Sequence, residues 1–243
     1  SKFLADALRR DGVELRLNSR AVAVRAGAGE RGRHVVELSD GTTAEGAALL
    51  MTVGRDIPLD RLNLGVIGIE PDNGRITVDE RLRIATNVYV AGDIAGPELH
   101  THTAHYQGEL AARVALGMDV KPDHSAIPRA TYTDPETSST GLLVEQAQAK
   151  GIDAQEFSEE LRHSAKGQAT ETTGHVTIVV DRQRRTLVGA FMAGPGVSET
   201  IHEAVLAVKL QTQLAVLADT IHAFPTVARV LGSLFIQADK ELA

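Results

Sequence analysis

A run of four apolar residues, 88–91 (VYVA), ends abruptly at Gly92 and Asp93. A short apolar run followed directly by a turn residue is typical of a buried strand that stops at the edge of a sheet. In open α/β folds, ligands bind at the carboxyl ends of the strands, and a glycine there lets another group approach the backbone closely. The pattern therefore predicts a candidate ligand site at Asp93, of the kind found in open α/β folds, unless this aspartate only caps a turn.

The first fifty residues predict one helix followed by a β-meander. Residues 3–10 place apolar side chains at the spacing of an amphipathic helix. Three segments that alternate apolar and polar residues follow, separated by Gly-containing or polar turns: 13–17, 21–24 and 34–38. We expect the meander to lead into a short buried strand, residues 49–53, that stops at Gly54.

The string from Gly27 to Gly32 matches G-x-G-x-x-G, the fingerprint of a dinucleotide pyrophosphate site. Such a site needs a strand before the glycines and a helix after them, because the helix N-terminus holds the anion. Here a strand-like segment follows instead, and Glu30 would face the phosphates. We therefore expect an ordinary hairpin turn.

A change of composition at residues 121–124 (KPDH) indicates a domain boundary. Beyond it, the patterns predict an antiparallel sheet with helices packed on it. Strands are expected at 129–133, 156–163, 174–180 and 186–193, and helices at 142–150, 198–211 and 226–240. The helix 198–211 has an apolar face of Ile201, Ala204, Val205 and Leu206, which suits packing either on its own sheet or on a second copy.

Composition excludes several classes of partner. The net charge of −7, the 3% aromatic content and the absence of Trp argue against nucleic acid or an anionic membrane as the main partner. The absence of Cys excludes disulfides, thiolate zinc sites and a cysteine nucleophile within these residues. No apolar run approaches the roughly 20 residues that span a bilayer, and the first residues lack a signal-peptide core. We expect a cytoplasmic protein.

Three histidines, His100, His102 and His105, lie close together before and within an expected helix at 104–116. Imidazoles at such spacing can bind zinc, but neither cysteines nor carboxylates stand at ligand spacing beside them. A wall next to a cofactor and a purely structural cluster are the two other interpretations. No metal site is predicted.

The segment 86–93 (TNVYVAGD) resembles the second FAD-binding motif of the pyridine nucleotide-disulfide oxidoreductases, the family that includes dihydrolipoamide dehydrogenase and mercuric reductase. Residues 52–58 (TVGRDIP) are similar to the strand-Gly-Arg-x-x-Pro element at the join between the NAD(P) and FAD domains of that family. Residues 132–136 (YTDPE) are similar to the opening of its C-terminal dimerisation domain, and residues 189–201 match the middle of that domain. The elements follow the family order along essentially the whole chain.

The resemblance implies partial nucleotide-binding portions followed by an α+β dimerisation domain. Residues 1–53 would be the C-terminal part of the NAD(P)-binding domain, 54–120 the C-terminal part of the FAD-binding domain, and 121–243 the dimerisation domain. The family's first Gly-rich FAD unit and its redox-active Cys pair have no counterpart here. We therefore expect a C-terminal piece of a longer flavoenzyme, a homodimer, that is inactive by itself.

The resemblance also implies a cofactor site. Asp93 would accept a hydrogen bond from a ribitol hydroxyl of FAD, which suits a carboxylate because it is acceptor-only. The helix that starts near residue 103 would point its N-terminus at the pyrimidine edge of the flavin, where the helix dipole stabilises the negative charge of the reduced ring. The implied cofactor-binding residues are Gly54, Arg55, Gly92, Asp93, Thr101, Thr103, Ala104 and His105.

One departure from the family concerns proton transfer. Its dithiol reductases carry a His before a Pro near the C-terminus and a Glu a few residues later, and this pair acts as a general acid/base. Phe224 and Arg229 occupy those positions here, and neither side chain can take part in such general acid/base catalysis. His222 lies two residues before Phe224 and is the candidate catalytic residue.

These substitutions favour an enzyme that passes hydride from NAD(P)H to FAD and then to a small-molecule electron acceptor other than a disulfide. A quinone, a metal ion or a second nicotinamide would suit. A non-catalytic dimerisation module and a disulfide reductase like dihydrolipoamide dehydrogenase are the alternatives. The choice between NADH and NADPH and the identity of the acceptor are left open by these residues.

Overall fold

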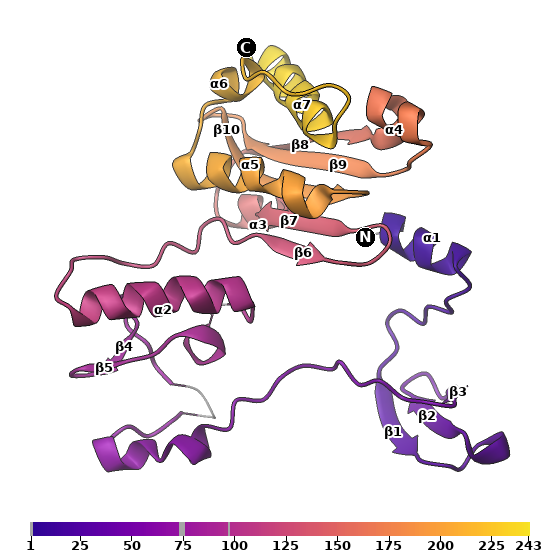
Figure 1. Cartoon of the computed structure of the whole chain (residues 1–243), viewed down its shortest axis with the longest axis vertical. Coiled ribbons are helices and arrows are strands. Elements are labelled where there is room, and N and C mark those ends of the chain that lie inside the picture. The colour runs from indigo at the N-terminus through magenta and orange to yellow at the C-terminus, as the bar shows by residue number, and fades with distance from the viewer. Residues whose placement is uncertain (1, 73–75, 97) are drawn as a thin grey trace. The chain divides into compact units, whose positions relative to one another are not determined.

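The computed structural model describes residues 2–72, 76–96 and 98–243. The chain divides into two compact units, one of residues 13–121 and one that joins residues 1–12 to residues 122–243. Each unit has its own helices and strands (Figure 1).

The unit 13–121 begins with an antiparallel meander in the order β1–β2–β3. β1 (Ala21–Arg25) pairs with β2 (His34–Leu38), and β2 pairs with β3 (Thr43–Gly46). Residues 27–32 connect β1 to β2 and include a short 3₁₀ turn, η1 (Glu30–Gly32). The predicted hairpin turn is therefore confirmed.

Two strand predictions in this unit are wrong. Residues 13–17 and 49–53 form no strand, although both alternate or cluster apolar side chains. Leu50 and Val53 are 86% and 85% exposed. A strand exists only where a neighbour completes its hydrogen-bond ladder, and no described strand pairs with either segment.

The second half of the unit consists of short elements around one long helix. Two 3₁₀ turns, η2 (Leu59–Leu62) and η3 (Leu64–Ile67), precede a two-stranded antiparallel pair of β4 (Arg83–Ala85) and β5 (Val88–Tyr89). The 3₁₀ turn η4 (Gly92–Ala95) follows, and then α2 (Thr101–Ala115). The run 88–91 was expected to be a buried strand, but only two of its residues are in a strand and both are half-buried.

The other unit is built on a five-stranded antiparallel sheet in the order β6–β7–β10–β9–β8 (Figure 1). The expected antiparallel sheet is confirmed. The strands are β6 (Arg129–Thr131), β7 (Thr137–Gly141), β8 (Ala154–Glu160), β9 (His175–Asp181) and β10 (Thr186–Ala193). β7 was not predicted, because its sequence TSSTG contains no apolar residue. The β9–β10 hairpin is fixed by Asp181, whose Oδ1 accepts from the backbone N–H groups of Gln183 and Arg184 at 2.9 and 3.0 Å.

Helices cover both faces of this sheet. The main core joins α5, α6 and α7 to alternate residues of β9 and β10 such as Ile178 and Ala190, and a smaller cluster places α3 against Val179 on the opposite face. The helices of this unit are α1 (Lys2–Arg10), α3 (Val144–Ala149), α4 (Ala165–Thr170), α5 (Val197–Leu210), α6 (Leu214–Ala218) and α7 (Val227–Glu241). The short helices α4 and α6 were not predicted.

The apolar face predicted for the helix at 198–211 divides between two environments. Ile201 and Ala204 are fully buried against the sheet, whereas Leu206 is 57% exposed. The face therefore packs partly on its own sheet and leaves an apolar edge outside.

Asp123 lies directly after the boundary between the units. Its Oδ1 accepts from the backbone N–H of Ser125 at 2.9 Å, and its Oδ2 pairs with Lys209 on α5 at 3.3 Å. The pKa of this carboxyl is held below its ordinary value, mainly by hydrogen bonds from Ser125 and also by the charge of Lys209.

In the parts of the chain that the structure describes, no helix combines the length and the apolar character that crossing a bilayer requires.

Candidate functional site

The turn η4 and the helix α2 are held together by one buried side chain. Oε1 of Gln107 accepts from the backbone N–H of Gly92 at 2.8 Å, and its Nε2 donates to the carbonyl of Gly96 at 2.6 Å. Gln107 is fully buried. Gly92 has a φ of +81°, and a Cβ there would lie 3.3 Å from Cβ of Ala104, so the turn lies directly against the first half of α2.

Sequence analysis did not identify Gln107 as a site residue. The signal that could have revealed it is its position on the buried stripe of α2, which otherwise consists of Thr103, Leu110 and Val114. A long polar side chain on such a stripe must find partners, since an unpaired buried amide is costly. Its two amide ends satisfy two backbone groups of η4.

Asp93 lies at the start of η4, shortly after β5. Its side chain is 27% exposed, and its Oδ2 forms an ion pair with Nη1 of Arg55. Gly54, with a φ of +130°, turns the chain directly before Arg55. The structure thus brings together the predicted residues Arg55 and Asp93, and within the described chain Oδ1 of Asp93 has no hydrogen bond.

The first turn of α2 is polar and lacks a side-chain cap. Its N-cap residue, His100, forms no capping hydrogen bond. Helices carry N–H groups without intrahelical acceptors in this turn, together with the positive end of the helix dipole. The hydroxyl of Thr103 is buried here without a hydrogen-bond partner in the described structure. Of the other predicted residues, Ala104 contacts the turn at Gly92, whereas Thr101 and His105 are exposed.

The histidine cluster is arranged as a stack. The rings of His100 and His102 lie 4.9 Å apart between centroids with an interplanar angle of 11°. Nε2 of His100 lies 3.1 Å from Oε2 of Glu98. His105 lies on the exposed side of the helix, and among the described residues no three His, Asp or Glu side chains are grouped as metal ligands would be. His100 and His102 therefore form a stacked pair at the start of α2, and His105 is not part of it.

The residues of the predicted proton-transfer position lie in the other unit, at the start of α7. Phe224 is 73% exposed, and Arg229 belongs to the first turn of α7, where its backbone N–H donates to Oγ1 of Thr226 at 3.1 Å. The side chain of His222 is 4% exposed, and its Nε2 lies 2.8 Å from Oε1 of Glu203 on α5. The structure therefore places the candidate base inside the unit and the aromatic ring outside.

A cavity of about 690 Å³ lies elsewhere, between α1 and the sheet of the same unit. Arg129, Glu160 and His175 line it together with apolar side chains such as Phe3 and Phe191. None of the residues predicted to bind a cofactor lines it. The candidate site at η4 and α2 therefore does not include this cavity.

Comparison with known proteins gives matches along most of the chain. A family profile described as pyridine nucleotide-disulphide oxidoreductase matches residues 1–108. A second, described as the dimerisation domain of the same family, matches residues 127–234.

Curated relatives include dihydrolipoyl dehydrogenases from several organisms. The protein of Halobacterium salinarum is 37% identical over 193 residues, which cover 77% of this chain and 40% of the relative. That of Geobacillus stearothermophilus is 35% identical over 231 residues, which cover 92% of this chain and 48% of the relative. The chain thus spans about half the length of the curated relatives it matches.

Two solved structures are similar to this chain in fold. The crystal structure of LpdA from Mycobacterium tuberculosis has a TM-score of 0.86 at 29% identity; the match covers 97% of this chain and 52% of that protein. The HOCl-induced flavoprotein disulfide reductase RclA of Escherichia coli has a TM-score of 0.84 over 97% of this chain and 54% of that protein, and at 23% identity it supports the fold alone. With family profiles on both units and these relatives, the chain belongs to the pyridine nucleotide-disulfide oxidoreductase family.

Proposed function

We propose that this chain forms part of an FAD-dependent NAD(P)H oxidoreductase that passes hydride from the nicotinamide to the flavin and then to a small-molecule acceptor. Residues 1–53 would belong to the NAD(P)-binding domain, 54–120 to the FAD-binding domain and 121–243 to the dimerisation domain. Membership of the family and the dihydrolipoyl dehydrogenase relatives support the reaction class. The observation that carries the proposal is the geometry at η4, where Asp93 and the uncapped start of α2 are fixed together by Gln107.

The residues at η4 and α2 fit the flavin cofactor. Oδ1 of Asp93 is available to accept from a ribitol hydroxyl, while Arg55 neutralises the other carboxylate oxygen. The hydroxyl of Thr103 lacks a partner within the described chain, and because its oxygen is buried, a ligand would contact it only after neighbouring side chains move. Gly92 has no side chain, which leaves room for the cofactor to approach the backbone of the turn closely.

When bound, FAD supplies the hydride-transfer chemistry, and the protein supplies position and electrostatics. Asp93 would hold the ribitol chain, and Arg55 would hold Asp93. The N-terminus of α2 would stabilise negative charge at the pyrimidine edge through its unpaired N–H groups and its dipole. The paired rings of His100 and His102 would form one wall beside that edge.

The flavin proposal is tested by titrating the purified 243-residue chain with FAD and following the fluorescence of the flavin. We expect weak but measurable binding, because the family's other FAD contacts come from segments that have no counterpart here. Asp93→Ala should raise the dissociation constant about tenfold, since hydrogen bonds to a charged group are the stronger kind.

Glu109→Ala is the matched control, because Glu109 is an exposed carboxylate on α2 itself. It should leave the affinity unchanged. Equal affinities of the wild type and Asp93→Ala would contradict the assignment of Asp93, and the absence of any FAD binding would contradict the cofactor site in this chain.

The proposed acceptor is a quinone, a metal ion or a nicotinamide, and not a disulfide. Phe224 replaces the proton-transferring His of the family, and Arg229 replaces its Glu. Phe cannot move a proton, and Arg cannot orient an imidazole as a carboxylate does. His222, the remaining imidazole, is buried against Glu203. This burial does not favour a role as a base that must reach substrate.

The acceptor is tested in the FAD-containing enzyme that includes these residues. With NAD(P)H as donor, we expect turnover of a quinone and little turnover of lipoamide. The double variant Phe224→His/Arg229→Glu restores the acid/base pair and should change the rate with lipoamide only if an upstream dithiol is present. Rapid lipoamide turnover by the wild type would instead support the alternative of a dihydrolipoyl dehydrogenase-like reductase.

A homodimer is part of the proposal, and the dimerisation-domain match over residues 127–234 supports it. The exposed apolar side chains Leu206, Leu210, Ile221 and Phe224 lie within this range. Sedimentation velocity of the purified chain tests the assembly. A dimer that binds no flavin would favour the alternative of a non-catalytic dimerisation module, whereas a monomer would contradict both proposals.

A further inference from the structure

In the segment between α6 and α7, large apolar side chains are exposed and a polar side chain is buried, which is the reverse of the usual arrangement. Ile221 is 98% exposed and Phe224 is 73% exposed, whereas the side chain of His222 between them is 4% exposed. Large apolar residues are normally inside, and an imidazole is only intermediate in burial. Something other than the apolar character of the segment must therefore hold its backbone in this position.

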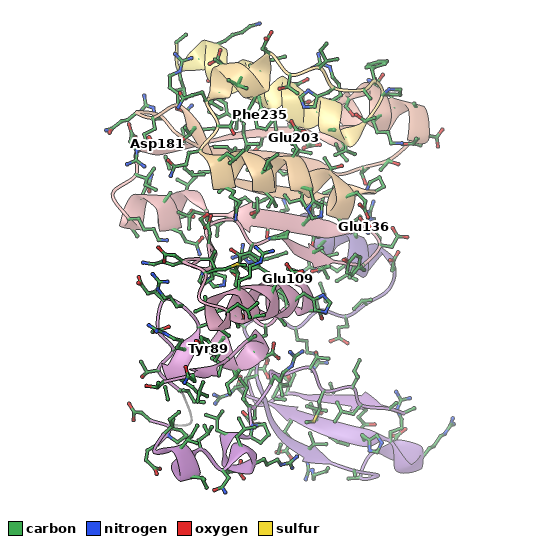
Figure 2. All side chains as sticks on the ribbon, turned by 60° about the vertical axis from the view of Figure 1, so that its left-hand side comes forward. Tyr89, Glu109, Glu136, Asp181, Glu203 and Phe235 are labelled. Atoms are coloured by element: carbon green, nitrogen blue, oxygen red, sulfur yellow. The ribbon has the colours of Figure 1, made fainter. Side chains whose placement is uncertain are left out.

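The imidazole of His222 is held from two directions. Its Nε2 lies 2.8 Å from Oε1 of Glu203 on α5, and its Nδ1 lies 2.9 Å from the carbonyl oxygen of Thr220 in the same segment. Figure 2 shows Glu203 projecting from α5 within the helical layer that covers the sheet. Each ring nitrogen thus faces an acceptor that is itself fixed, the first by a helix and the second by the loop.

The imidazole ring of His222 also lies against Gly232 on α7, a residue without a side chain. A Cβ built on Gly232 would lie 2.4 Å from Nδ1 and 2.6 Å from Cε1 of His222. Gly232 is buried in the interior of α7. A glycine in a helix interior costs about 1 kcal/mol relative to alanine. The close approach of the ring accounts for its presence there.

The far end of the segment is fixed as well. Oγ1 of Thr226 caps α7 by accepting from the backbone N–H of Arg229 at 3.1 Å, and it donates to the carbonyl of Ala223 at 2.6 Å. Phe224 therefore lies between two attachment points, the ring of His222 and the cap of α7. Both attachments restrict the backbone on either side of Phe224.

We propose that His222 is a positioning residue, which clasps the segment 221–225 to α5 and α7 through Glu203 and Gly232. The clasp presents Ile221 and Phe224 for contact with a second copy of this chain. The occupant is argued from the dimerisation-domain match, which includes the whole segment. The inference rests on the homodimer proposed above and adds the residue that orients the contact.

The test measures loop order and association separately in the full 243-residue chain. Hydrogen exchange of peptides covering residues 219–226 reports the clasp, and sedimentation equilibrium reports the dimer. Three variants each change one partner in the clasp: His222→Ala in the segment itself, Glu203→Ala on α5 and Gly232→Ala on α7. Each should speed exchange of the segment and raise the dimer dissociation constant, both by about tenfold, the size expected for loss of a charged hydrogen bond.

Two further variants separate the clasp from general stability. Glu199→Ala removes another, exposed carboxylate from α5 and should change neither measurement. Glu203→Gln retains an oxygen acceptor for Nε2 and should restore most of the loop protection that Glu203→Ala loses. If Gly232→Ala does not fold, the coupling between His222→Ala and Glu203→Ala decides, because two changes that remove one hydrogen bond are not additive.

Additive effects of His222→Ala and Glu203→Ala, or unchanged loop exchange in both, would overturn the clasp. Faster loop exchange with an unchanged dimer would overturn its role in presenting Phe224. A monomeric wild type whose loop still responds to these variants would identify the homodimer proposal as the failed step, and it would also remove the second copy as occupant.

Discussion

Gly92 and Gln107 are joined by a hydrogen bond of 2.8 Å from the backbone N–H of the turn η4 to a fully buried side-chain oxygen on α2. The same amide donates to the carbonyl of Gly96 at the other end of the turn. One side chain therefore satisfies both ends of η4, and the direction of Asp93 depends on it.

Replacing Gln107 by Leu should destabilise the unit 13–121 by roughly 3 kcal/mol, because the change leaves two backbone groups unpaired and keeps most of the volume. Urea unfolding followed by circular dichroism measures the loss. Glu109→Gln, on the exposed side of α2, should change the free energy of unfolding by less than about 0.5 kcal/mol. Similar stabilities of the two variants would show that the amide does not support the turn.

A comparison of Gly92→Ala with Gly117→Ala distinguishes the cost of a positive φ from the cost of steric crowding around the new Cβ. Both glycines have positive φ, +81° and +85°, so alanine should cost about 1 kcal/mol at either position. At Gly117 a Cβ meets nothing within 4 Å, whereas at Gly92 it lies 3.3 Å from Ala104. Unfolding of the two variants should therefore show a larger loss for Gly92→Ala, and equal losses would exclude close packing of η4 on α2.

In the other unit, Gly189→Ala should cost roughly 3 kcal/mol or abolish folding, since its Cβ would lie 2.2 Å from the carbonyl oxygen of Leu142. Gly151→Ala is the control, with a positive φ of +77° and no atom within 4 Å of its Cβ. It should lose only about 1 kcal/mol. Thermal unfolding compares them, and a Gly189→Ala protein as stable as the control would contradict the close approach at β10.

Asp123 gives a pH dependence with a defined sign. Its carboxyl pKa is lowered in the folded chain by hydrogen bonds from Ser125 and by Lys209. Folding therefore favours the carboxylate, and the resulting stability is fully present above the unfolded-state pKa of about 3.9 and is lost as the pH falls through the lower folded-state pKa. Asp123→Asn should be less stable than the wild type at neutral pH and equally stable in strong acid. Parallel stability curves across this range would contradict the assignment.

Much of the sheet unit could be predicted from sequence because apolar periodicity there reflects burial against partners in the same unit. The strands β9 and β10 and the helices α5 and α7 lie within a few residues of their predicted ranges. β7 was missed because its serines and threonines leave no apolar pattern. Residues 49–53 show the opposite error, since an apolar run predicts a strand but cannot show whether a neighbouring strand exists to pair with it.

The candidate site was predictable at Asp93 and less so around it. A glycine and an aspartate after an apolar run are visible in sequence, and the family resemblance adds Arg55 and the start of α2. The roles of Gln107 and of the buried hydroxyl of Thr103 depend on three-dimensional contacts between η4 and α2, which no local pattern encodes. The burial of His222 was equally inaccessible, because Glu203 and Gly232 are distant in sequence.

The hydroxyl-rich strand β7 sets the axial position of α5. Oγ of Ser138 donates to the carbonyl of Val197 at 2.7 Å, and Oε2 of Glu136, which directly precedes the strand, accepts from Oγ of Ser198 at 2.7 Å. The helix cannot slide along its axis or turn about it without breaking both bonds. A displacement of β7, which lies between β6 and β10 in the sheet, would therefore be transmitted to α5, the helix that carries Glu203.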